Sequence, residues 1–266
     1  MQYLIFTDLD GTLISHEDYR YSPVPAKIVE LKLSHVPVFL NSSKTFAELK
    51  AWQKRLGAEP LVICENGGVI VNVKTSKAEL IGRPYEEICR VLDELRITRH
   101  FKFSGFHDWT LNTLISQTQL SAEDATLAQK RQVTEPIVWE DSESALEAFR
   151  HALDQQGLQL QKGGRFFHVM GHHDKAVALK KVAKDYLSQK ELSSSSYKVI
   201  ALGDSGNDLK MLQSADFPIV LPGRDGSYLN IHKRNQIHAS HPAPDGWVEA
   251  IDALRLNGDC AFQSVS

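Results

Sequence analysis

Short apolar runs that end in polar residues or glycines recur near both ends of the chain. They are apolar on both faces, which is typical of buried parallel strands. These runs lie at residues 3–7, 36–40, 61–64, 197–202 and 215–221. Segments with helical character lie at residues 24–34, 46–56, 174–186, 209–214 and 245–256. This alternation predicts an α/β fold, with helices on both faces of a doubly wound, mostly parallel, Rossmann-like sheet.

The middle of the chain has a different pattern, because strands and helices are mixed there without buried parallel runs. We expect helices at residues 86–95, 109–116, 122–129 and 142–155. We expect strands at residues 101–103, 136–139 and 158–161. Residues 83–167 are therefore predicted to form an inserted α+β cap domain, and residues 1–82 and 168–266 a discontinuous core domain.

Composition and charge place the chain among ordinary globular proteins. Of its 266 residues, 42% are hydrophobic and 24% are charged, and the formal net charge is −3. These values exclude a disordered, collagen-like or membrane-spanning class and give no sign of a nucleic-acid partner. The first apolar run is too short for a signal-peptide core, so we expect a cytoplasmic protein. Cys64, Cys89 and Cys260 show no CxxC spacing and are expected to be free thiols in a reducing compartment.

Two carboxylates follow the first predicted strand. Asp8 and Asp10 are two residues apart, so alternation along an extended chain directs both toward one site. One carboxylate can attack a phosphoryl group as a nucleophile, and the other can act as general acid and base. Gly11 allows the chain to leave the strand sharply. The alternative interpretation is a surface turn in which both acids are solvated.

A second acidic cluster follows a later strand, at residues 203–208. Asp204 and Asp208, if close to Asp8 and Asp10, would bring four carboxylates into one small volume. Such a cluster requires a compensating cation. Oxygen ligands without cysteine favour a hard cation, Mg²⁺ before Ca²⁺. The alternative is a strand-to-helix turn that is capped by an aspartate.

Further groups suited to an anion lie near predicted helix starts. Ser42 and Ser43 offer hydroxyl and backbone N–H groups near a helix N-terminus, which can hold a phosphate. Ser43 or Thr45 would serve equally well as an ordinary helix cap. Lys175 lies in the first turn of its helix, where it is either directed at an anion or solvated at the surface.

The order of these segments resembles motifs one to four of the haloacid dehalogenase superfamily of phosphohydrolases. The matching segments are Asp8–Thr12, Ser42, Lys175 and Gly203–Asp208. The long insertion resembles a cap of the C2 type, and the resemblance spans nearly the whole chain. Within the superfamily, the chain resembles the mannosyl-3-phosphoglycerate phosphatase family. The segments that carry this narrower resemblance are residues 6–13, 42–45, 65–68 and 164–169.

The resemblance implies a catalytic role for each matched residue. Asp8 would be the nucleophile and a Mg²⁺ ligand. Asp10 would be the general acid and base and would also bind the metal through its backbone carbonyl. Ser42, with Ser43, would hold the oxygens of the transferring phosphoryl group. Lys175 would neutralise Asp8 and the phosphate.

The resemblance also completes the metal site. Asp204 would be the third metal ligand, with Asp208 behind it. One departure concerns the lysine motif, where many relatives have Gly-Lys and this chain has Asp174 before Lys175. The sequence therefore does not determine the path of the loop that leads to Lys175.

Substrate-binding candidates lie near the return from the cap and in loops after strands. Arg165 suits the recognition of a carboxylate, as in a glyceric acid moiety, and His168 lies close to it in sequence. Glu65 and Asn66 offer hydrogen bonds to sugar hydroxyls, and Lys44 is a further candidate. The alternatives are a surface or hinge position for Arg165 and a core position for His168.

These residues predict a Mg²⁺-dependent phosphatase of a small phosphorylated sugar acid, which the resemblance narrows to mannosyl-3-phosphoglycerate, acting through an aspartyl phosphate. The alternatives are a sugar phosphomutase similar to phosphomannomutase, a phosphatase of another sugar phosphate, and a non-catalytic binding module. A dinucleotide cofactor is not expected, since no GxGxxG segment follows the first strand. The expected ligands are the substrate and Mg²⁺, without a nucleic-acid or membrane partner.

Overall fold

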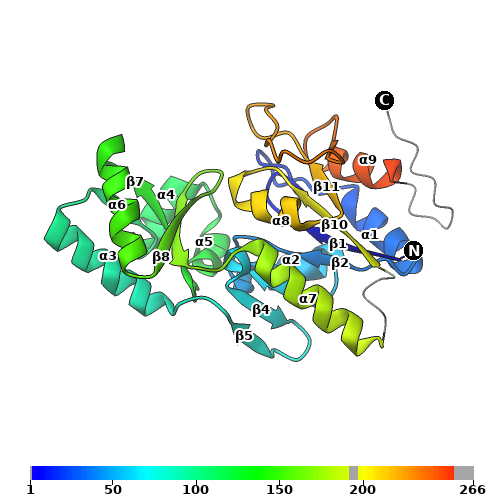
Figure 1. The fold of residues 1–266 in the computed structure, drawn as a ribbon, viewed down its shortest axis with the longest axis horizontal. Helices are drawn as coiled ribbons and strands as arrows, with labels where there is room; N and C mark the ends of the chain where they lie inside the picture. The colour runs from blue at the N-terminus through cyan, green and yellow to red at the C-terminus, as the bar shows by residue number, and fades with distance from the viewer. Residues whose placement is uncertain (1, 192–196, 255–266) are drawn as a thin grey trace.

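The structure is a computed structural model that describes residues 2–191 and 197–254 (Figure 1). Its ribbon has two parts, one with the N-terminal strand and the other with the middle of the sequence, drawn in green. Cys260 and the run of four serines at residues 193–196 lie outside the described residues. Among the helices of the described segments, none combines the length and apolar character that crossing a membrane requires.

The larger part is built on a five-stranded sheet in which all neighbouring strands are parallel. The strand order is β12-β11-β10-β1-β2. The strands are β1 (Gln2–Thr7), β2 (Val38–Leu40), β10 (Tyr197–Gly203), β11 (Phe217–Val220) and β12 (Ile237–His238). The apolar runs predict the first four of these strands but not β12, which is too short to carry a pattern. The sheet confirms the predicted α/β fold.

Helices cover both faces of this sheet, because alternate apolar residues of each strand point to opposite sides. The helices are α1 (Val24–Leu33), α2 (Phe46–Leu56), α7 (Lys175–Gln189), α8 (Leu209–Ser214) and α9 (Asp245–Ala253). Ile5 of β1 packs in the apolar cluster with α1, α2 and α9. Leu4 and Phe6 pack on the opposite face with α7 and α8. A strand between two helical layers must be apolar on both sides, which explains the continuous apolar runs.

The third predicted strand does not extend the parallel sheet. β3 (Leu61–Cys64) pairs antiparallel with β4 (Val69–Asn72), which pairs antiparallel with β5 (Ala78–Leu80). A single parallel bridge from Ile63 links this small sheet to the end of β2. The expectation of a further parallel strand is corrected here. The short turn at residues 65–68 reverses the chain, so β4 can pair with β3 only in the antiparallel direction. β3 forms its ladder with β4, and a single parallel bridge is its link to β2.

The second part contains a four-stranded antiparallel sheet with the order β6-β7-β9-β8. Its strands are β6 (Phe103–Gly105), β7 (Thr134–Trp139), β8 (Leu158–Lys162) and β9 (Phe167–Gly171). Its helices are α3 (Tyr85–Arg99), α4 (Leu111–Thr118), α5 (Ala122–Ala128) and α6 (Glu143–Gln155). Helices α3 and α6 pack in one apolar cluster, which includes Phe149 of α6. Helices α4 and α5 form a separate cluster with Trp109. This part matches the predicted α+β insertion.

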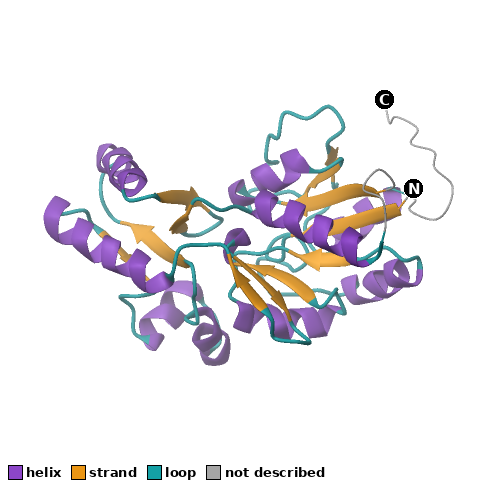
Figure 2. Ribbon diagram, turned by 60° about the horizontal axis from the view of Figure 1, so that its bottom comes forward, coloured by secondary structure: helices purple, strands orange, loops and turns teal. Residues whose placement is uncertain are grey.

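The strand β9 is the element of this sheet that the sequence pattern does not predict. It lies between β7 and β8, so the antiparallel sheet extends to Gly171, beyond the boundary expected at residue 167. Figure 2 shows this sheet and the parallel sheet as separate groups of strands. We propose to divide the chain into a cap, residues 83–171, and a core formed by the remaining described residues.

A carboxyl group is buried in the cap beside neutral hydrogen-bond donors. Glu135 of β7 is 1% exposed and accepts hydrogen bonds from the His107 backbone N–H (2.8 Å) and the Tyr85 hydroxyl (2.7 Å). Burial raises the pKa of Glu135 from 4.5 to about 7, against the lowering effect of these two donors. The pKa of Glu135 is higher in the folded state than in the unfolded state. The group therefore makes its full contribution to stability when the pH is below its pKa in the unfolded state. That contribution is lost as the pH rises through the pKa of Glu135 in the folded state.

We expect Glu135→Gln to remove this pH dependence, because the amide carries no charge at any pH in the range. From about pH 5 to about pH 8.5, the free energy of unfolding of the wild type should fall by about 2–3 kcal/mol more than that of the variant. Urea denaturation at several pH values measures the difference. Glu140→Gln, at an exposed position just after β7, is the control. Parallel pH curves for the wild type and Glu135→Gln would contradict the expectation.

Candidate active site

The strand order reverses beside β1, because β2 lies on one side of it and β10, β11 and β12 lie on the other. At such a point, the loops that leave neighbouring strands diverge and open a crevice in which ligands bind. The register places Thr7 beside Leu202 and Leu40. Asp8 follows β1 and Asp204 follows β10, so both residues begin loops that border the crevice.

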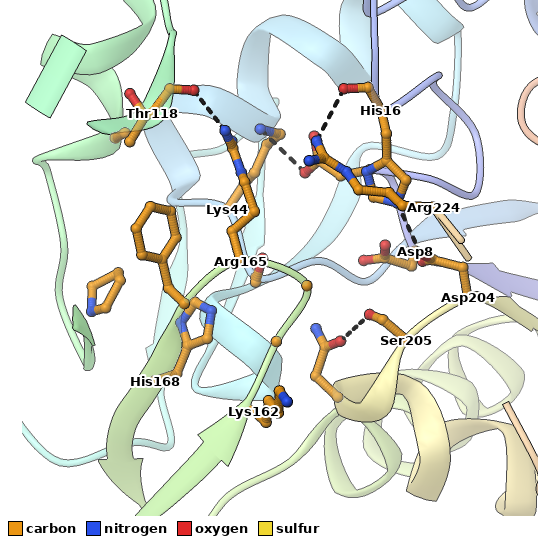
Figure 3. A pocket seen from close by; sticks show the side chains of 18 of the residues that line it. Asp8, His16, Lys44, Thr118, Lys162, Arg165, His168, Asp204, Ser205 and Arg224 are labelled. Carbon is orange, nitrogen blue, oxygen red and sulfur yellow. Dashed lines mark hydrogen bonds and ion pairs between the residues drawn. The ribbon is translucent and has the colours of Figure 1, made fainter. Parts of the chain in front are cut away.

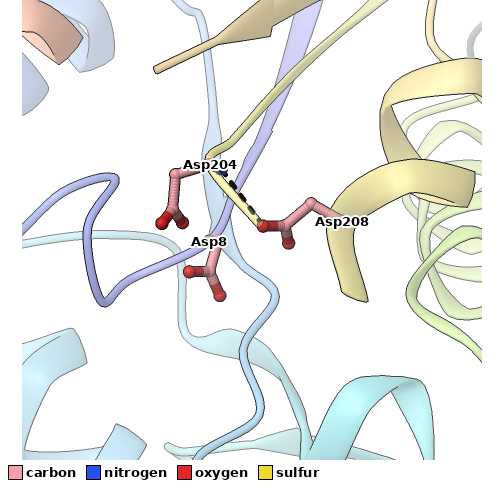
Figure 4. A group of neighbouring side chains, drawn as sticks. All are labelled: Asp8, Asp204 and Asp208. Atoms are coloured by element: carbon pink, nitrogen blue, oxygen red, sulfur yellow. Dashed lines mark hydrogen bonds between the residues drawn. The ribbon is translucent and has the colours of Figure 1, made fainter. Parts of the chain in front are cut away.

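Three buried carboxylates meet at this crevice (Figure 4). Asp8, Asp204 and Asp208 each place an oxygen within 4.8 Å of the others, and none is more than 7% exposed. Lys175 is fully buried beside them, with its Nζ 2.5 Å from Asp8 Oδ1 and 2.7 Å from Asp208 Oδ1. The two acidic segments and the lysine, which are far apart in sequence, thus form one cluster.

Burial determines much of the electrostatics of this cluster. It raises the pKa of Asp8 well above its usual range, while Lys175 opposes the rise and Asp208 adds to it. Burial also raises the pKa of Asp204, against the effect of a hydrogen bond with His16. For Lys175, burial lowers the pKa, but Asp208 and Asp8 raise it by more, so the ammonium group stays charged. One buried cation faces three carboxylates, and the cluster can therefore accept further positive charge.

Lys175 is positioned by the start of α7 and by two neighbouring loops. The side chain of Asp174 caps the helix by accepting a hydrogen bond from the Val177 N–H (2.8 Å). Gly67 has a φ of +93°, and a Cβ at this position would lie 2.2 Å from the carbonyl oxygen of Asp174. Asn41 Nδ2 donates a hydrogen bond to the carbonyl of Lys175 (2.9 Å). The path of the loop is therefore determined by an aspartate cap and by close packing against Gly67.

Asp10 shares the crevice with Asp8 but has a different partner. Its Oδ2 lies 3.2 Å from Lys44 Nζ, which is also 3.5 Å from Glu48 Oε1. Burial lowers the pKa of Lys44, but Asp10 and Glu48 raise it by more, so Lys44 is charged. The ring of Tyr19 lies 5.8 Å from the same ammonium group. Lys44, a predicted substrate contact, lines the pocket while it is paired with two carboxylates of the protein.

The two serines after β2 differ in their access to the crevice. Ser43 lines the pocket. Ser42 is fully buried, and its Oγ accepts a hydrogen bond from the backbone N–H of Lys44 (3.3 Å). The N–H of Ser42 donates to the carbonyl of Ile63 (3.0 Å). Ser43 is thus the serine that borders the space in which a ligand would lie.

Glu65 and Asn66, which we expected to contact sugar hydroxyls, are directed into the protein. Both are fully buried, and neither is among the residues that line the pocket. The carboxylate of Glu65 accepts hydrogen bonds from the N–H groups of Gln132 and Thr134 in the cap (each 2.9 Å). Asn66 Oδ1 accepts a hydrogen bond from Asn207 Nδ2 (3.0 Å). The expectation of sugar binding is corrected: these side chains join distant segments of the protein.

A pocket of about 540 Å³ opens between the acid cluster and the cap (Figure 3). On its cap side, Arg165 donates a hydrogen bond to the carbonyl of Thr118 (2.6 Å) and lies over the ring of Phe166. His168 is buried, and its Nδ1 has no hydrogen-bond partner among the described residues. Burial lowers the pKa of His168 to about 3, so its imidazole is neutral. The pocket therefore joins the carboxylate of Asp8 to polar groups of the cap.

Several polar residues at the pocket carry no sequence signal that would have identified them. They are His16, Arg131, Lys162 and Arg224. His16 Nε2 lies 3.0 Å from Asp204 Oδ2, and Arg224 donates a hydrogen bond to the carbonyl of His16 (3.2 Å). These residues lie in loops or at a strand end, where neither periodicity nor a motif distinguishes them. The positive charges of Arg131, Lys162 and Arg224 suit an anionic ligand.

A parallel core with an inserted cap, together with a buried acid–lysine cluster where the strand order reverses, defines the class of phosphohydrolases that the sequence motifs indicate. Residues 5–222 match the family of haloacid dehalogenase-like hydrolases. The chain belongs to this family, and it is a phosphatase, a phosphoric monoester hydrolase.

A curated relative agrees with this assignment, and solved structures agree with the fold. A glucosyl-3-phosphoglycerate/mannosyl-3-phosphoglycerate phosphatase of Persephonella marina is 33% identical over 265 residues, which cover 93% of this chain and 95% of the relative. A protein of Thermoplasma acidophilum has a TM-score of 0.71 at 17% identity, covering 96% of this chain and 99% of its own. A haloalkanoate-superfamily phosphatase of Bacteroides thetaiotaomicron has a TM-score of 0.71 at 15% identity, covering 96% of each chain. These structures share the fold.

Proposed function

We propose that the enzyme is a Mg²⁺-dependent phosphatase of a phosphorylated sugar acid, glucosyl- or mannosyl-3-phosphoglycerate, and acts through an aspartyl phosphate on Asp8. The position of Asp8 carries this proposal: its carboxylate lies 2.5 Å from Lys175 Nζ and borders a pocket that reaches the cap. Phosphoryl transfer requires charge neutralisation and alignment around the nucleophile. The Persephonella marina relative acts, by its name, on these two substrates.

The oxygen atoms of the acid cluster fit a hard divalent cation. Asp8 and Asp204 are close to each other and buried, and burial raises the pKa of both. A cation bound between them would favour their charged forms. With the backbone carbonyl of Asp10, these two carboxylates would hold Mg²⁺, which keeps water and phosphate oxygens as further ligands. Asp208 would lie behind them and fix Lys175. When bound, the ion supplies charge that reduces the repulsion between Asp8 and the phosphate.

The proposed reaction has two steps. In the first, an oxygen of Asp8 attacks phosphorus, and the bond from phosphorus to the sugar-acid oxygen breaks while Asp10 donates a proton to that oxygen. In the second, Asp10 takes a proton from water, which attacks the aspartyl phosphate and releases inorganic phosphate and the carboxylate of Asp8. Lys175 balances the charge on Asp8. Ser43, with Ser42 beside it, orients the phosphoryl oxygens.

The pocket supports a leaving group that is both polar and anionic. Arg165, Lys162 and Arg224 bring positive charge to it. A guanidinium group recognises a carboxylate through paired hydrogen bonds, and Arg165 uses one of its N–H groups on the carbonyl of Thr118. His168, which is neutral, also lines the pocket. These groups favour a sugar acid over a neutral sugar phosphate.

A phosphate-release screen in the presence of Mg²⁺ tests the proposal. We expect the highest kcat/KM with glucosyl- or mannosyl-3-phosphoglycerate, and at least about tenfold less with an analogue whose carboxylate is replaced by a hydroxymethyl group. EDTA should abolish the activity and added Mg²⁺ should restore it. Isomerisation of a sugar phosphate with little phosphate release would identify a phosphomutase instead. Equal rates with and without the carboxylate would contradict the sugar-acid specificity.

We also propose that the enzyme works in the cytoplasm. Cys64 and Cys89 are buried free thiols, which suit a reducing compartment. Fractionation of cells that produce the native protein measures its location, and recovery outside the cytoplasm would contradict this proposal.

A further inference from the structure

Glu65 begins η1 (Glu65–Gly67), directly after β3, and takes no part in the chemistry described above. Its φ of +49° and the φ of +57° at Asn66 lie in the left-handed region, which residues other than glycine seldom adopt. A residue other than glycine stays in this conformation where the surrounding contacts offset the free-energy cost of the positive φ. The contacts of Glu65 extend in two directions, to the cap and to the core.

The carboxylate of Glu65 accepts four hydrogen bonds from the anchor segment, residues 131–134 of the cap. Oε1 accepts from the N–H of Gln132 (2.9 Å). Oε2 accepts from the N–H groups of Val133 (3.0 Å) and Thr134 (2.9 Å) and from the hydroxyl of Thr134 (2.9 Å). A carboxylate only accepts hydrogen bonds, so it suits converging donors. The amide of a glutamine would direct its own donors toward one of them.

The backbone of Glu65 is bound on the opposite side, by the core. Its N–H donates to the carbonyl of Lys44 (2.9 Å), which follows Ser43 at the pocket. Its carbonyl lies 3.2 Å from Nε2 of His173, two residues before Lys175. Glu65 thus connects the serine loop, the start of the lysine helix and the cap. A side-chain substitution removes the cap contacts and leaves the backbone contacts with the core in place.

Apolar packing reinforces the same junction. Val133 is fully buried and belongs to the apolar cluster of the core, although it is a cap residue. A Cβ at Gly68 would lie 2.4 Å from Val133 Cγ2, and a Cβ at Gly82 would lie 2.6 Å from Val133 Cβ. Arg131 Nη2 donates a hydrogen bond to the carbonyl of Ser43 (2.9 Å). Polar and apolar contacts together therefore hold the anchor segment against the core.

We propose that Glu65 is a positioning residue: its carboxylate holds the anchor segment on the core and thereby sets where the cap places Arg165 and His168 relative to Asp8. The kinetic consequence rests on the proposed phosphatase function, whereas the anchoring does not. Because Glu65 is buried away from the pocket, its effect on turnover acts through the cap. A substrate whose leaving group reaches the cap depends on Glu65, and a phosphate with a very small leaving group does not.

Hydrogen exchange tests the anchor in the full-length protein without any substrate. In Glu65→Gln, we expect the amides of residues 132–134 to exchange at least about tenfold faster than in the wild type, while the amides of β1 keep their rate. Glu79→Gln removes the same charge from the exposed strand β5, where its partner is Lys181, and should change neither rate. Unchanged exchange at residues 132–134 in Glu65→Gln would overturn the proposal.

A milder variant keeps the proposal testable if Glu65→Gln does not fold. Thr134→Val retains the shape of the side chain and removes the hydroxyl that donates to Glu65 Oε2 and accepts hydrogen bonds from Arg131. We expect the same amides to exchange about threefold to tenfold faster in this variant. Exchange at the wild-type rate would count against the anchor.

Enzyme kinetics separate a cap effect from a defect in the core. In Glu65→Gln, kcat for the sugar-acid phosphate should fall about tenfold, whereas hydrolysis of acetyl phosphate, whose leaving group is too small to reach Arg165, should stay within about twofold. Equal losses on both substrates would overturn the proposed action through the cap. If the wild type hydrolyses acetyl phosphate but no sugar acid, the proposed substrate is wrong. The exchange experiment then decides on the anchor alone.

Discussion

An enzyme in which Asp8 is replaced by asparagine is expected to fold and to lose at least about 10⁴-fold of its phosphatase activity. The amide has nearly the shape of the carboxylate but cannot attack phosphorus. Folding should be preserved because burial raises the pKa of Asp8, so removing its charge relieves a cost. Lys175 keeps its contact with Asp208 at 2.7 Å in the variant.

Phosphate release under saturating substrate, together with urea denaturation, measures the two parts of this prediction. Asp18→Asn is the matched control, because Asp18 is an exposed carboxylate in the loop after β1. The control should retain the wild-type turnover. Turnover of Asp8→Asn within about tenfold of the wild type would show that another group is the nucleophile.

Substitution of Lys175 by methionine is expected to lower the free energy of unfolding by about 3–5 kcal/mol. The side chain is fully buried and lies within 2.7 Å of two carboxylates, so its loss leaves Asp8 and Asp208 without their buried cation. Methionine fills a similar volume, so the loss arises from charge and not from a cavity. Phosphatase activity should fall at least about 100-fold, because repulsion between Asp8 and the phosphate is no longer balanced.

The pH dependence of Lys175→Met identifies the cause of its instability. Lys175 lowers the pKa of Asp8, so its removal raises that pKa further above the unfolded value. A raised folded-state pKa means that stability is lost as the pH rises, and the deficit of the variant should therefore grow from about pH 5 to about pH 8. Lys180→Met, at an exposed position of α7, is the control. A variant within about 1 kcal/mol of the wild type at about pH 8 would contradict this explanation.

The acid cluster could be predicted from sequence because it depends on local patterns. Apolar runs identify β1 and β10, and polar residues follow each run at its carboxyl end. Parallel strands present these ends at one edge of the sheet, so Asp8 and Asp204 meet once the two strands pair. The order of the motifs, which resembles a known superfamily, supplies the lysine as well.

The role of Glu65 and the pairing of β3 could not be predicted in the same way. The partners of the Glu65 carboxylate lie 67 to 69 residues further along the chain. A glutamate before Asn-Gly-Gly is typical of a solvated turn, and nothing near it in sequence shows that the cap covers it. Arg224 and Lys162 likewise become part of the pocket only through the way the cap and the core come together.

Chemical trapping of a phosphorylated carboxylate decides whether Asp8 is the nucleophile. In Asp10→Asn, the first step can proceed with a good leaving group such as that of acetyl phosphate, but no general base activates water for the second. Acid quenching followed by peptide mass spectrometry should then find one phosphoryl group on the peptide that contains Asp8, and none in Asp8→Asn. Phosphate release without a phosphorylated peptide, or a phosphoryl group on another residue, would contradict the proposed aspartyl phosphate.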